Sequence, residues 1–221
     1  MRDIMCGRFS LTSETNRIVE AFDIDEVKGA FRNSYNIAPG QDIGAIIEDN
    51  SRRLGPLRWG LIPSWADDPR IGSRMINARA EGLEQKASFK TPLRQKRCLI
   101  PADGFYEWKK EGNRKTPFYV FLKDKSPFVF AGLWDIWKSP QGEKTATCTI
   151  ITTSPNSLVK ELHNRMPVIL PKEHIDLWLD SSMREEEKLL SLLKPYPAEE
   201  MECHEVSPLV NSPEEDSEKL F

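Results

Sequence analysis

Several classes of protein are excluded by what this sequence lacks. It has no run of about eighteen apolar residues and no charged-then-apolar leader, so we expect neither a membrane span nor a secretory signal. Its four cysteines are widely separated, without a Cys-x-x-Cys pair or cysteine–histidine ligand spacing, which argues against a disulfide framework or a zinc site. The three histidines are too scattered for a metal site. We therefore expect a cytoplasmic protein that needs no metal and no organic cofactor.

The charge of the chain is small overall but unevenly distributed. The net charge is −3, yet residues 52–97 carry eleven basic and four acidic side chains, whereas residues 181–221 carry four basic and eleven acidic ones. The basic stretch also contains Trp59, Trp65 and Phe89. Cations interleaved with aromatic rings are typical of a surface that binds single-stranded nucleic acid, although charge clusters also form ordinary solvated faces.

The hydrophobic pattern predicts one α+β domain. With 221 residues, 39% of them hydrophobic, the chain is long enough for one substantial core. Short apolar runs between turn residues predict strands, and apolar residues at helical spacing predict short helices near the two ends. The predicted strands are 43–47, 57–61, 98–100, 104–109, 118–122, 128–137, 145–153, 168–170 and 201–206; the predicted helices are 13–22, one or two within 79–95, 157–162, 172–179 and 182–193.

Adjacent strands joined by short turns favour a largely antiparallel mixed sheet with a barrel-like core and flanking short helices. Thr12 or Ser13 is expected to cap the first helix, and Ser182 with Glu185 forms a predicted capping box. The cysteines at 98 and 148 lie in apolar stretches and are expected to be inert core residues. We divide the chain into an N-terminal extension (1–5), one domain (6–211) and an acidic tail (212–221), and we expect the residues after 207 to be irregular or partly disordered.

The pair Met5-Cys6 has distinctive chemistry. If Met5 is the initiator and is removed, Cys6 carries a free amine and a thiol on adjacent carbons, which condense with an aldehyde into a thiazolidine ring. An α-amine titrates near ~7.8 and a lysine near ~10.4, so the terminal amine is roughly 400-fold more often unprotonated at neutral pH. The alternative is that Cys6 is one more small apolar residue in a first strand.

Seven segments in order carry a resemblance to a known family: Cys6-Gly7-Arg8-Phe9, Tyr35-Asn36-Ile37-Ala38-Pro39-Gly40, Trp59-Gly60-Leu61-Ile62-Pro63-Ser64-Trp65, Met75-Ile76-Asn77-Ala78-Arg79-Ala80-Glu81, Pro101-Ala102-Asp103-Gly104-Phe105-Tyr106-Glu107-Trp108, Ala131-Gly132-Leu133-Trp134 and Leu162-His163-Asn164-Arg165-Met166-Pro167-Val168-Ile169-Leu170. Together they resemble the SOS-response-associated peptidase (SRAP) family, the abasic-site processing proteins. The resemblance extends from position 6 to about position 211.

The resemblance implies a role for each matching residue. Cys6 matches the catalytic cysteine, whose amine forms a Schiff base with the ring-opened aldehyde of an abasic site in single-stranded DNA and whose thiol closes the thiazolidine. Glu107 matches a glutamate that passes protons beside that amine, and Asn77 an asparagine that orients the reacting group. His163 matches a histidine that moves protons at the sugar hydroxyl.

The resemblance also implies a surface that binds DNA. Arg79 and Arg165 match arginines that bind phosphates, for which a bidentate guanidinium is well suited. The other residues that we expect to contact DNA are Arg8, Asn36, Pro39 and Trp65.

Each of these side chains has an ordinary structural alternative. Glu107 lies in an apolar strand and could face solvent by period-two alternation. His163 could be a hydrogen-bonded structural histidine, and Trp65 and Trp108 could be core residues.

The chain departs from the family pattern at its start, because members begin at Met-Cys and here residues 1–4 precede Met5. Translation could start at Met5, or the chain could cleave itself before Cys6, which is the peptidase activity for which the family was named. If neither happens, thiazolidine chemistry is impossible and only DNA binding remains.

We therefore weigh three functions for a monomer that acts without a membrane. The first is covalent trapping of abasic sites in single-stranded DNA during the DNA-damage (SOS) response, with association to the nucleoid when DNA is bound. The second is a thiol peptidase that uses Cys6 with His163 and Glu107. The third is a plain single-stranded DNA-binding module, whose binding would be salt-sensitive and indifferent to the lesion.

Overall fold

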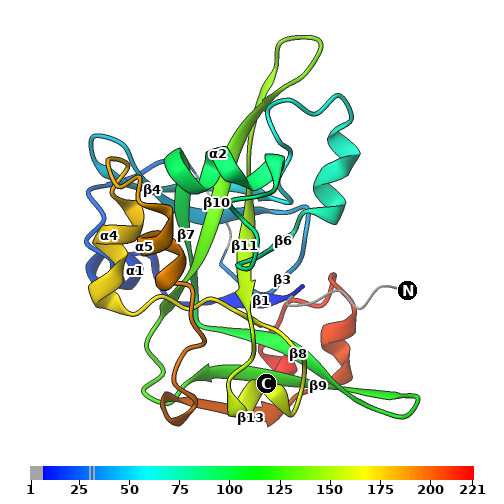
Figure 1. Ribbon diagram of the computed structural model, residues 1–221. Coiled ribbons are helices and arrows are strands. Elements are labelled where there is room, and N and C mark those ends of the chain that lie inside the picture. The colour runs from blue at the N-terminus through cyan, green and yellow to red at the C-terminus, as the bar shows by residue number, and fades with distance from the viewer. Residues whose placement is uncertain (1–6, 30, 32) are drawn as a thin grey trace.

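A closed ring of five strands forms the centre of the molecule (Figure 1). The computed structural model describes residues 7–29, 31 and 33–221. Around the ring each strand pairs with the next, and the parallel pairing of β11 with β5 closes it. The five strands, in spatial order, are β11 (Lys144–Thr153), β10 (Phe128–Lys138), β7 (Arg97–Ala102), β4 (Asp42–Glu48) and β5 (Arg52–Trp59). The predicted barrel-like, largely antiparallel core is confirmed.

Strand β11 also carries two short strands beyond the ring. The strand β6 (Asn77–Arg79) pairs with it in parallel, and β12 (Met166–Pro167) pairs with it in antiparallel orientation. Thr152 of β11 is in register with Arg79 on one side and with Pro167 on the other. Segments far apart in sequence are therefore brought side by side across one strand. A two-residue edge strand, β2 (Glu26–Val27), pairs in parallel with β5.

A second, antiparallel sheet lies below the barrel in the view of Figure 1. Its strands, in spatial order, are β13 (Met201–Glu205), β9 (Arg114–Leu122), β8 (Gly104–Glu111), β1 (Phe9–Leu11) and β3 (Ser34–Ile37). Only Asp103 separates barrel strand β7 from β8, so the chain passes directly from one sheet to the other.

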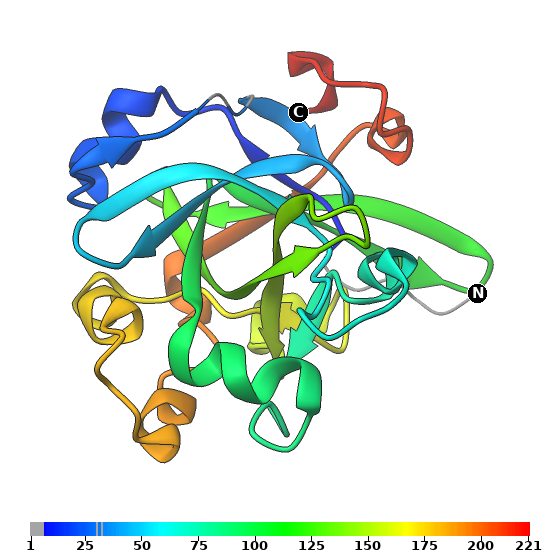
Figure 2. The same cartoon turned by 90° about the horizontal axis from the view of Figure 1, so that it is seen from above.

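Short helices flank the two sheets, as the view from above shows (Figure 2). They are α1 (Thr15–Ala21), α2 (Ala87–Gln95), α3 (Ser157–Lys160), α4 (Ile175–Leu179) and α5 (Glu186–Ser191). Single 3₁₀ turns occur at Pro69–Arg74, Lys172–His174, Ala198–Glu200, Pro208–Asn211 and Glu218–Leu220. No helix in the described part of the chain is long and apolar enough to cross a membrane.

One hydrophobic core joins the barrel to the second sheet. Phe9 of β1 is fully buried, and its ring lies edge-on to Trp59 at 5.3 Å and to Phe130 at 5.7 Å between ring centroids. Such pairs stabilise by about 0.5–1.5 kcal/mol beyond the area they bury. Cys98 and Cys148 lie in the same core, as predicted, and burial raises the pKa of both thiols.

Two predicted helix caps are wrong, because the hydroxyl groups of the predicted capping residues donate hydrogen bonds to aspartates outside the helices. The hydroxyl groups of Thr12 and Ser13 donate to the carboxylate of Asp103, so helix α1 begins at Thr15 without a side-chain cap. Ser182 likewise donates to Asp180 (2.6 Å), and α5 begins only at Glu186. Asp103 thereby ties the end of β1 to the connection between the two sheets.

Two further predictions differ from the structure. The strand expected at 168–170 is instead the two-residue β12, followed by an isolated bridge at Ile169. The disorder expected after residue 207 is also wrong, because Leu220 is fully buried and Asn36 donates hydrogen bonds to the carbonyl groups of Ser212 and Glu215. The buried Leu220 side chain and the buried Asn36 amide therefore hold residues 208–221 in a defined structure, although their composition is polar.

Gly132 of β10 allows the barrel strands to pack closely. A Cβ atom there would lie 2.3 Å from Ile100 Cδ1, 2.9 Å from Cys98 Sγ and 3.0 Å from the Thr149 carbonyl oxygen. Because the last of these is backbone, we expect Gly132→Ala to lower the free energy of unfolding by about 1–3 kcal/mol. Chemical denaturation measures this. Lys138→Ala, at the exposed end of the same strand, should change stability by less than about 0.5 kcal/mol, and equal midpoints for the two variants would contradict the packing argument.

Candidate active site

The pairing of β1 with β8 brings the N-terminal segment to Glu107. Phe9 is in register with Phe105, and the Tyr106 N–H donates to the Arg8 carbonyl oxygen at 3.0 Å. Continued by one residue on each strand, this register places Gly7 opposite Glu107. Gly7 is buried and is the first described residue, so Cys6 lies outside the described residues. Since consecutive Cα atoms are about 3.8 Å apart, Cys6 is joined directly to the residue that faces Glu107.

Glu107 is a buried carboxylic acid. Its residue is 1% exposed and lies in β8 between fully buried Tyr106 and half-buried Trp108. The alternative that Glu107 faces solvent by strand alternation is therefore wrong. A carboxyl group is costly to bury, and such groups concentrate at functional sites.

Strand β6 presents Asn77 and Arg79 on one face. Ala78 between them is 1% exposed and packs into the core, so the neighbours on either side point the other way. Arg79 is exposed. The Asn77 side-chain nitrogen is buried and has no hydrogen-bond partner among the described residues. An unpaired buried N–H donor costs about 1–3 kcal/mol, so this amide is ready for an acceptor that a ligand would bring.

His163 follows helix α3 and has a defined orientation. Asn156 caps α3 by accepting from the Val159 N–H at 2.9 Å, and the His163 N–H donates to the Val159 carbonyl oxygen at 2.8 Å. The Arg165 N–H donates to His163 Nδ1 at 3.2 Å. Because Nδ1 accepts, the proton of the neutral ring lies on Nε2.

Arg165 is held by hydrogen bonds to Glu81 and Thr152. Its two terminal nitrogens donate to the two carboxylate oxygens of Glu81, each at 2.8 Å, and Nη2 also donates to the Thr152 carbonyl oxygen at 2.6 Å. The Arg165 side chain is only 14% exposed, whereas that of Glu81 is 59% exposed. Arg165 Nε is buried and has no partner within the described part of the chain. The hydrogen bonds from Arg165 hold the pKa of Glu81 below its ordinary value.

Charged neighbours connect the two halves of this site. Lys109 lies two residues beyond Glu107 on the same strand face, and Glu161 lies two residues before His163. Glu161 raises the pKa of Lys109, after the larger effect of the Lys109–Glu111 ion pair. Helix α3, which precedes His163, contacts strand β13 of the second sheet, while β6 and the segment with Arg165 lie on either side of β11. Among residues 7–29, 31 and 33–221, no group of three or more His, Cys, Asp or Glu could hold a metal ion. A carboxylic acid, an imidazole and amide donors are suited to proton transfer.

Two of the expected DNA contacts have partners within the protein. Arg8 donates to Asn36 Oδ1 at 2.9 Å and to the carbonyl oxygens of Val210 and Asn211. Asn36 is 1% exposed, and its amide donates to the C-terminal segment. The donors of Arg8 and Asn36 therefore hold the C-terminal segment, and their contact with DNA stays a prediction.

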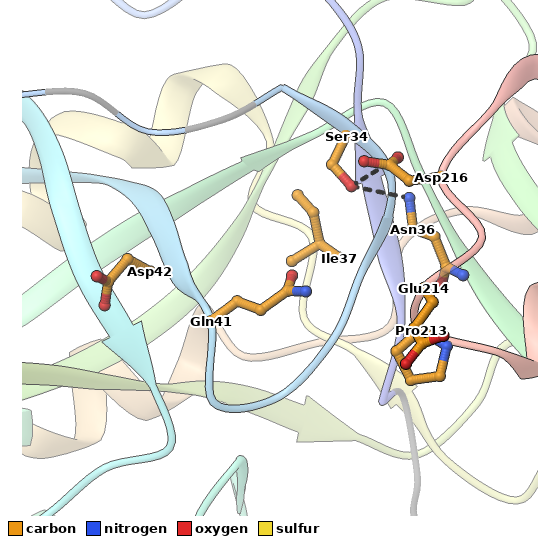
Figure 3. A pocket seen from close by; sticks show the side chains of 8 residues that line it. All are labelled: Ser34, Asn36, Ile37, Gln41, Asp42, Pro213, Glu214 and Asp216. Atoms are coloured by element: carbon orange, nitrogen blue, oxygen red, sulfur yellow. Dashed lines mark hydrogen bonds between the residues drawn. The ribbon is translucent and has the colours of Figure 1, made fainter.

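Asn36 also borders a cavity of about 320 Å³ between β3 and the C-terminal segment (Figure 3). Figure 3 shows the Asp216 carboxylate bonded to the Ser34 hydroxyl group at one side of it. Asp42 and Glu214 also line the cavity. These carboxylates would repel phosphate, so the cavity is not part of the site that Glu107 and His163 define.

The aromatic residues of the basic stretch divide into two groups. Trp59 and Phe89 are 1% and 5% exposed, so the expectation that they stack on bases is wrong. Trp65 is 57% exposed, and Pro39 is half-buried. The Trp65 loop is held by the Asp135 carboxylate, which accepts from the Ser64 N–H at 2.8 Å. Trp65 is thus an exposed ring on a firmly held loop, as base stacking requires.

The basic residues of the same stretch divide in a similar way. Several are engaged inside the protein by acids or carbonyl groups: Arg52, Arg53, Arg70, Arg94, Lys96 and Arg97. Arg79 is exposed and takes part in no ion pair with another described residue. The predicted electropositive surface is consequently smaller than the count of basic residues indicated.

Sequence reasoning missed Glu81. It directly follows the Asn77-Ala78-Arg79-Ala80 run, but only the structure shows that it reaches across β11 to Arg165. Its place at the end of a run dense in site residues was the available signal.

Comparison with known proteins places this site in context. A sequence model described as "SOS response associated peptidase (SRAP)" matches residues 5–213. The abasic site processing protein YoqW of Bacillus subtilis is 52% identical over 221 residues, which cover 98% of this chain and 99% of the relative. The abasic site processing protein HMCES of Gallus gallus is 34% identical over 224 residues, which cover 86% of this chain and 66% of the relative.

A similar fold has been solved in another organism. A crystal structure of a protein from Bacteroides thetaiotaomicron superposes with a TM-score of 0.88 at 29% sequence identity. The superposition covers 97% of this chain and 98% of that chain. The two-sheet architecture described above is therefore shared over nearly the full length of both proteins.

The Arg165–Glu81 contact predicts which of two arginine substitutions raises the pKa of Glu81 more. Arg165 is the largest cause of the lowered value and Arg79 is the smallest, so Arg165→Met should raise the Glu81 pKa more than Arg79→Met does. Because the folded-state pKa is lowered, the stabilisation is present above the ordinary pKa near ~4.3 and is lost as the pH falls through the lowered value. Carboxyl ¹³C NMR titration measures this, and equal shifts in the two variants would contradict the assignment.

Proposed function

Because the chain belongs to the SOS response associated peptidase (SRAP) family, we propose that it traps abasic sites in single-stranded DNA covalently through Cys6. The observation that carries the proposal is the buried Glu107 on strand β8, which pairs with β1 directly after the N-terminal segment. The names of the relatives, abasic site processing proteins, support the substrate class. The SRAP name and these names also support a place in the response to DNA damage.

The proposed reaction starts from a chain that begins at Cys6. The α-amine attacks the ring-opened aldehyde carbon, and loss of one water leaves an imine. The thiolate sulfur then adds to the imine carbon, and the nitrogen takes up one proton, which closes the thiazolidine. Overall one carbon–nitrogen and one carbon–sulfur bond form, and one water leaves. Translation from Met5 with removal of that methionine, or cleavage before Cys6, would supply the free amine.

Three side chains would move protons or orient the sugar in this reaction. Glu107 would take a proton from the attacking amine and return it to the departing water, as its burial close to the N-terminal segment favours. His163 would donate from Nε2 to the sugar oxygen during ring opening, since its Nδ1 is engaged by Arg165. Asn77 would donate its unpaired amide hydrogen to a substrate oxygen.

The DNA would lie along the face that carries these groups. Exposed Arg79 is the proposed phosphate ligand on β6, and Arg165 would add its unpaired Nε. Trp65 and Pro39 would contact bases, of which only the tryptophan offers a large exposed ring. Each arginine lies two positions after a proposed site residue, Asn77 or His163, so phosphate contacts would place the lesion beside that residue.

Intact mass spectrometry tests the covalent chemistry. The purified protein is incubated with a single-stranded oligonucleotide that carries one abasic site. We expect a chain that begins at Cys6 and a product heavier by the oligonucleotide less one water. Cys6→Ala should form no such product, whereas Cys203→Ala, a matched control at a half-buried free thiol, should form it at the wild-type rate.

The alternatives predict different results in the same assay. A thiol peptidase would cleave peptide substrates without DNA and form no adduct. A plain DNA-binding module would bind the oligonucleotide with or without the lesion and leave its mass unchanged. A Cys6→Ala variant that still forms the adduct would overturn the role of Cys6.

The phosphate contact of Arg79 predicts a change in salt dependence. Each phosphate neutralised on a single strand contributes about 0.7 to the slope of log affinity against log salt concentration. We expect Arg79→Ala to weaken binding and to reduce the slope by about that amount. Fluorescence anisotropy across a salt series measures it, with Arg17→Ala on α1 as the control for loss of one exposed charge. An unchanged slope would remove Arg79 from the DNA contacts.

A further inference from the structure

We infer that Glu81 is a positioning residue, which holds His163 in its reactive orientation by clamping Arg165. The inference rests on the proposed function of His163, and it assigns a role to a residue that neither motif reasoning nor the comparisons single out. Glu81 touches none of the groups expected to react, so it would act only through Arg165.

Glu81 clamps Arg165 with both of its carboxylate oxygens. Both carboxylate oxygens of Glu81 accept from Arg165 at 2.8 Å, which is the bidentate arrangement that restricts a guanidinium most. The third bond runs from Arg165 to the Thr152 carbonyl oxygen, which also accepts from the Ala80 N–H at 2.8 Å. One carbonyl of β11 thus ties together the end of β6 and the segment that leads into β12.

The clamp is connected to His163 through the backbone of Arg165. Backbone hydrogen bonds to α3 hold residues 161–163, and β12 begins only at Met166. The Arg165 N–H contributes to the orientation of the His163 ring, because it donates to Nδ1 at 3.2 Å. That N–H can point at the ring only while Arg165 stays in place, and its side chain is fixed by Glu81 and Thr152.

The surroundings of Arg165 favour a role for Glu81 in holding Arg165 over a role in competing with DNA phosphate. A carboxylate on an arginine could instead occupy the place of a DNA phosphate and be displaced by it. Arg165, however, is 14% exposed and is tied to the backbone as well, so removing Glu81 would leave a mostly buried cation without its counter-ion. Glu81 also leaves the Arg165 Nε–H donor unused, so the carboxylate does not occupy every donor of the guanidinium.

The experiment compares Glu81→Gln with Glu81→Asp and with Glu161→Gln. Glu161→Gln is the matched control, because it removes one negative charge two residues from His163 without touching Arg165. Crosslinking rates are measured over a range of abasic oligonucleotide concentrations. We expect Glu81→Gln to lower the saturating rate by about 10- to 100-fold, which is less than the roughly 10²–10⁴-fold that a proton-transfer group itself contributes, with less than a threefold change in the half-saturating concentration. Glu81→Asp, which keeps both oxygens and the charge, should recover part of the rate.

A DNA-free measurement separates this inference from the proposed function. In the wild type and in Glu161→Gln, ¹⁵N NMR should show neutral His163 with its proton on Nε2, whereas Glu81→Gln should show a mixture of tautomers. An unchanged tautomer in Glu81→Gln, or a saturating rate equal to wild type, would overturn the positioning role. Tighter DNA binding with an unchanged rate would show that Glu81 competes with phosphate. If the wild type forms no adduct, the proposed function fails. The NMR comparison of the His163 tautomer in the wild type and Glu81→Gln would then be the only test of the positioning role.

Discussion

Strand β11 is the element on which the site depends. It closes the barrel by pairing with β5, and beyond that contact it pairs with β6 on one side and β12 on the other. A register is strongly specified where one face is buried, because a slip by one residue would exchange core and surface side chains. The buried face of β11 therefore sets the positions of Asn77, Arg79 and Arg165 with respect to one another, although they lie up to 88 residues apart in sequence.

The other half of the site follows from the second sheet. Pairing of β1 with β8 brings Gly7 to Glu107, and packing of Phe9 against Trp59 and Phe130 joins that sheet to the barrel. The candidate site thus lies where two separately paired sheets meet. Each half is fixed by backbone hydrogen bonds and buried rings, which resist the small displacements that would misalign proton transfer.

The sequence predicted the fold better than the connections within it. Strands between 98 and 153 were predictable because alternation and turn residues are local signals. The caps at Thr12, Ser13 and Ser182 were not, because Asp103 and Asp180 compete for the same hydroxyl groups, and the order at Leu220 depends on a buried amide far away in sequence. Motif order proposed the site residues, whose roles stay predictions. Burial of Glu107 and the clamp by Glu81 arise from pairing between strands far apart in sequence, which spacing along the chain does not reveal.

The unpaired donors of this face would suit the oxygens of a sugar-phosphate strand. Asn77 and Arg165 each keep one buried N–H without an acceptor in the described part of the chain. Each such group costs about 1–3 kcal/mol until an acceptor arrives. Phosphate and sugar oxygens are numerous acceptors that repeat along a strand, and a ring-opened abasic sugar adds an aldehyde oxygen with no base to block access. A ligand that satisfies both donors recovers that cost on binding, and the aldehyde carbon would then lie between the buried carboxyl group and the imidazole.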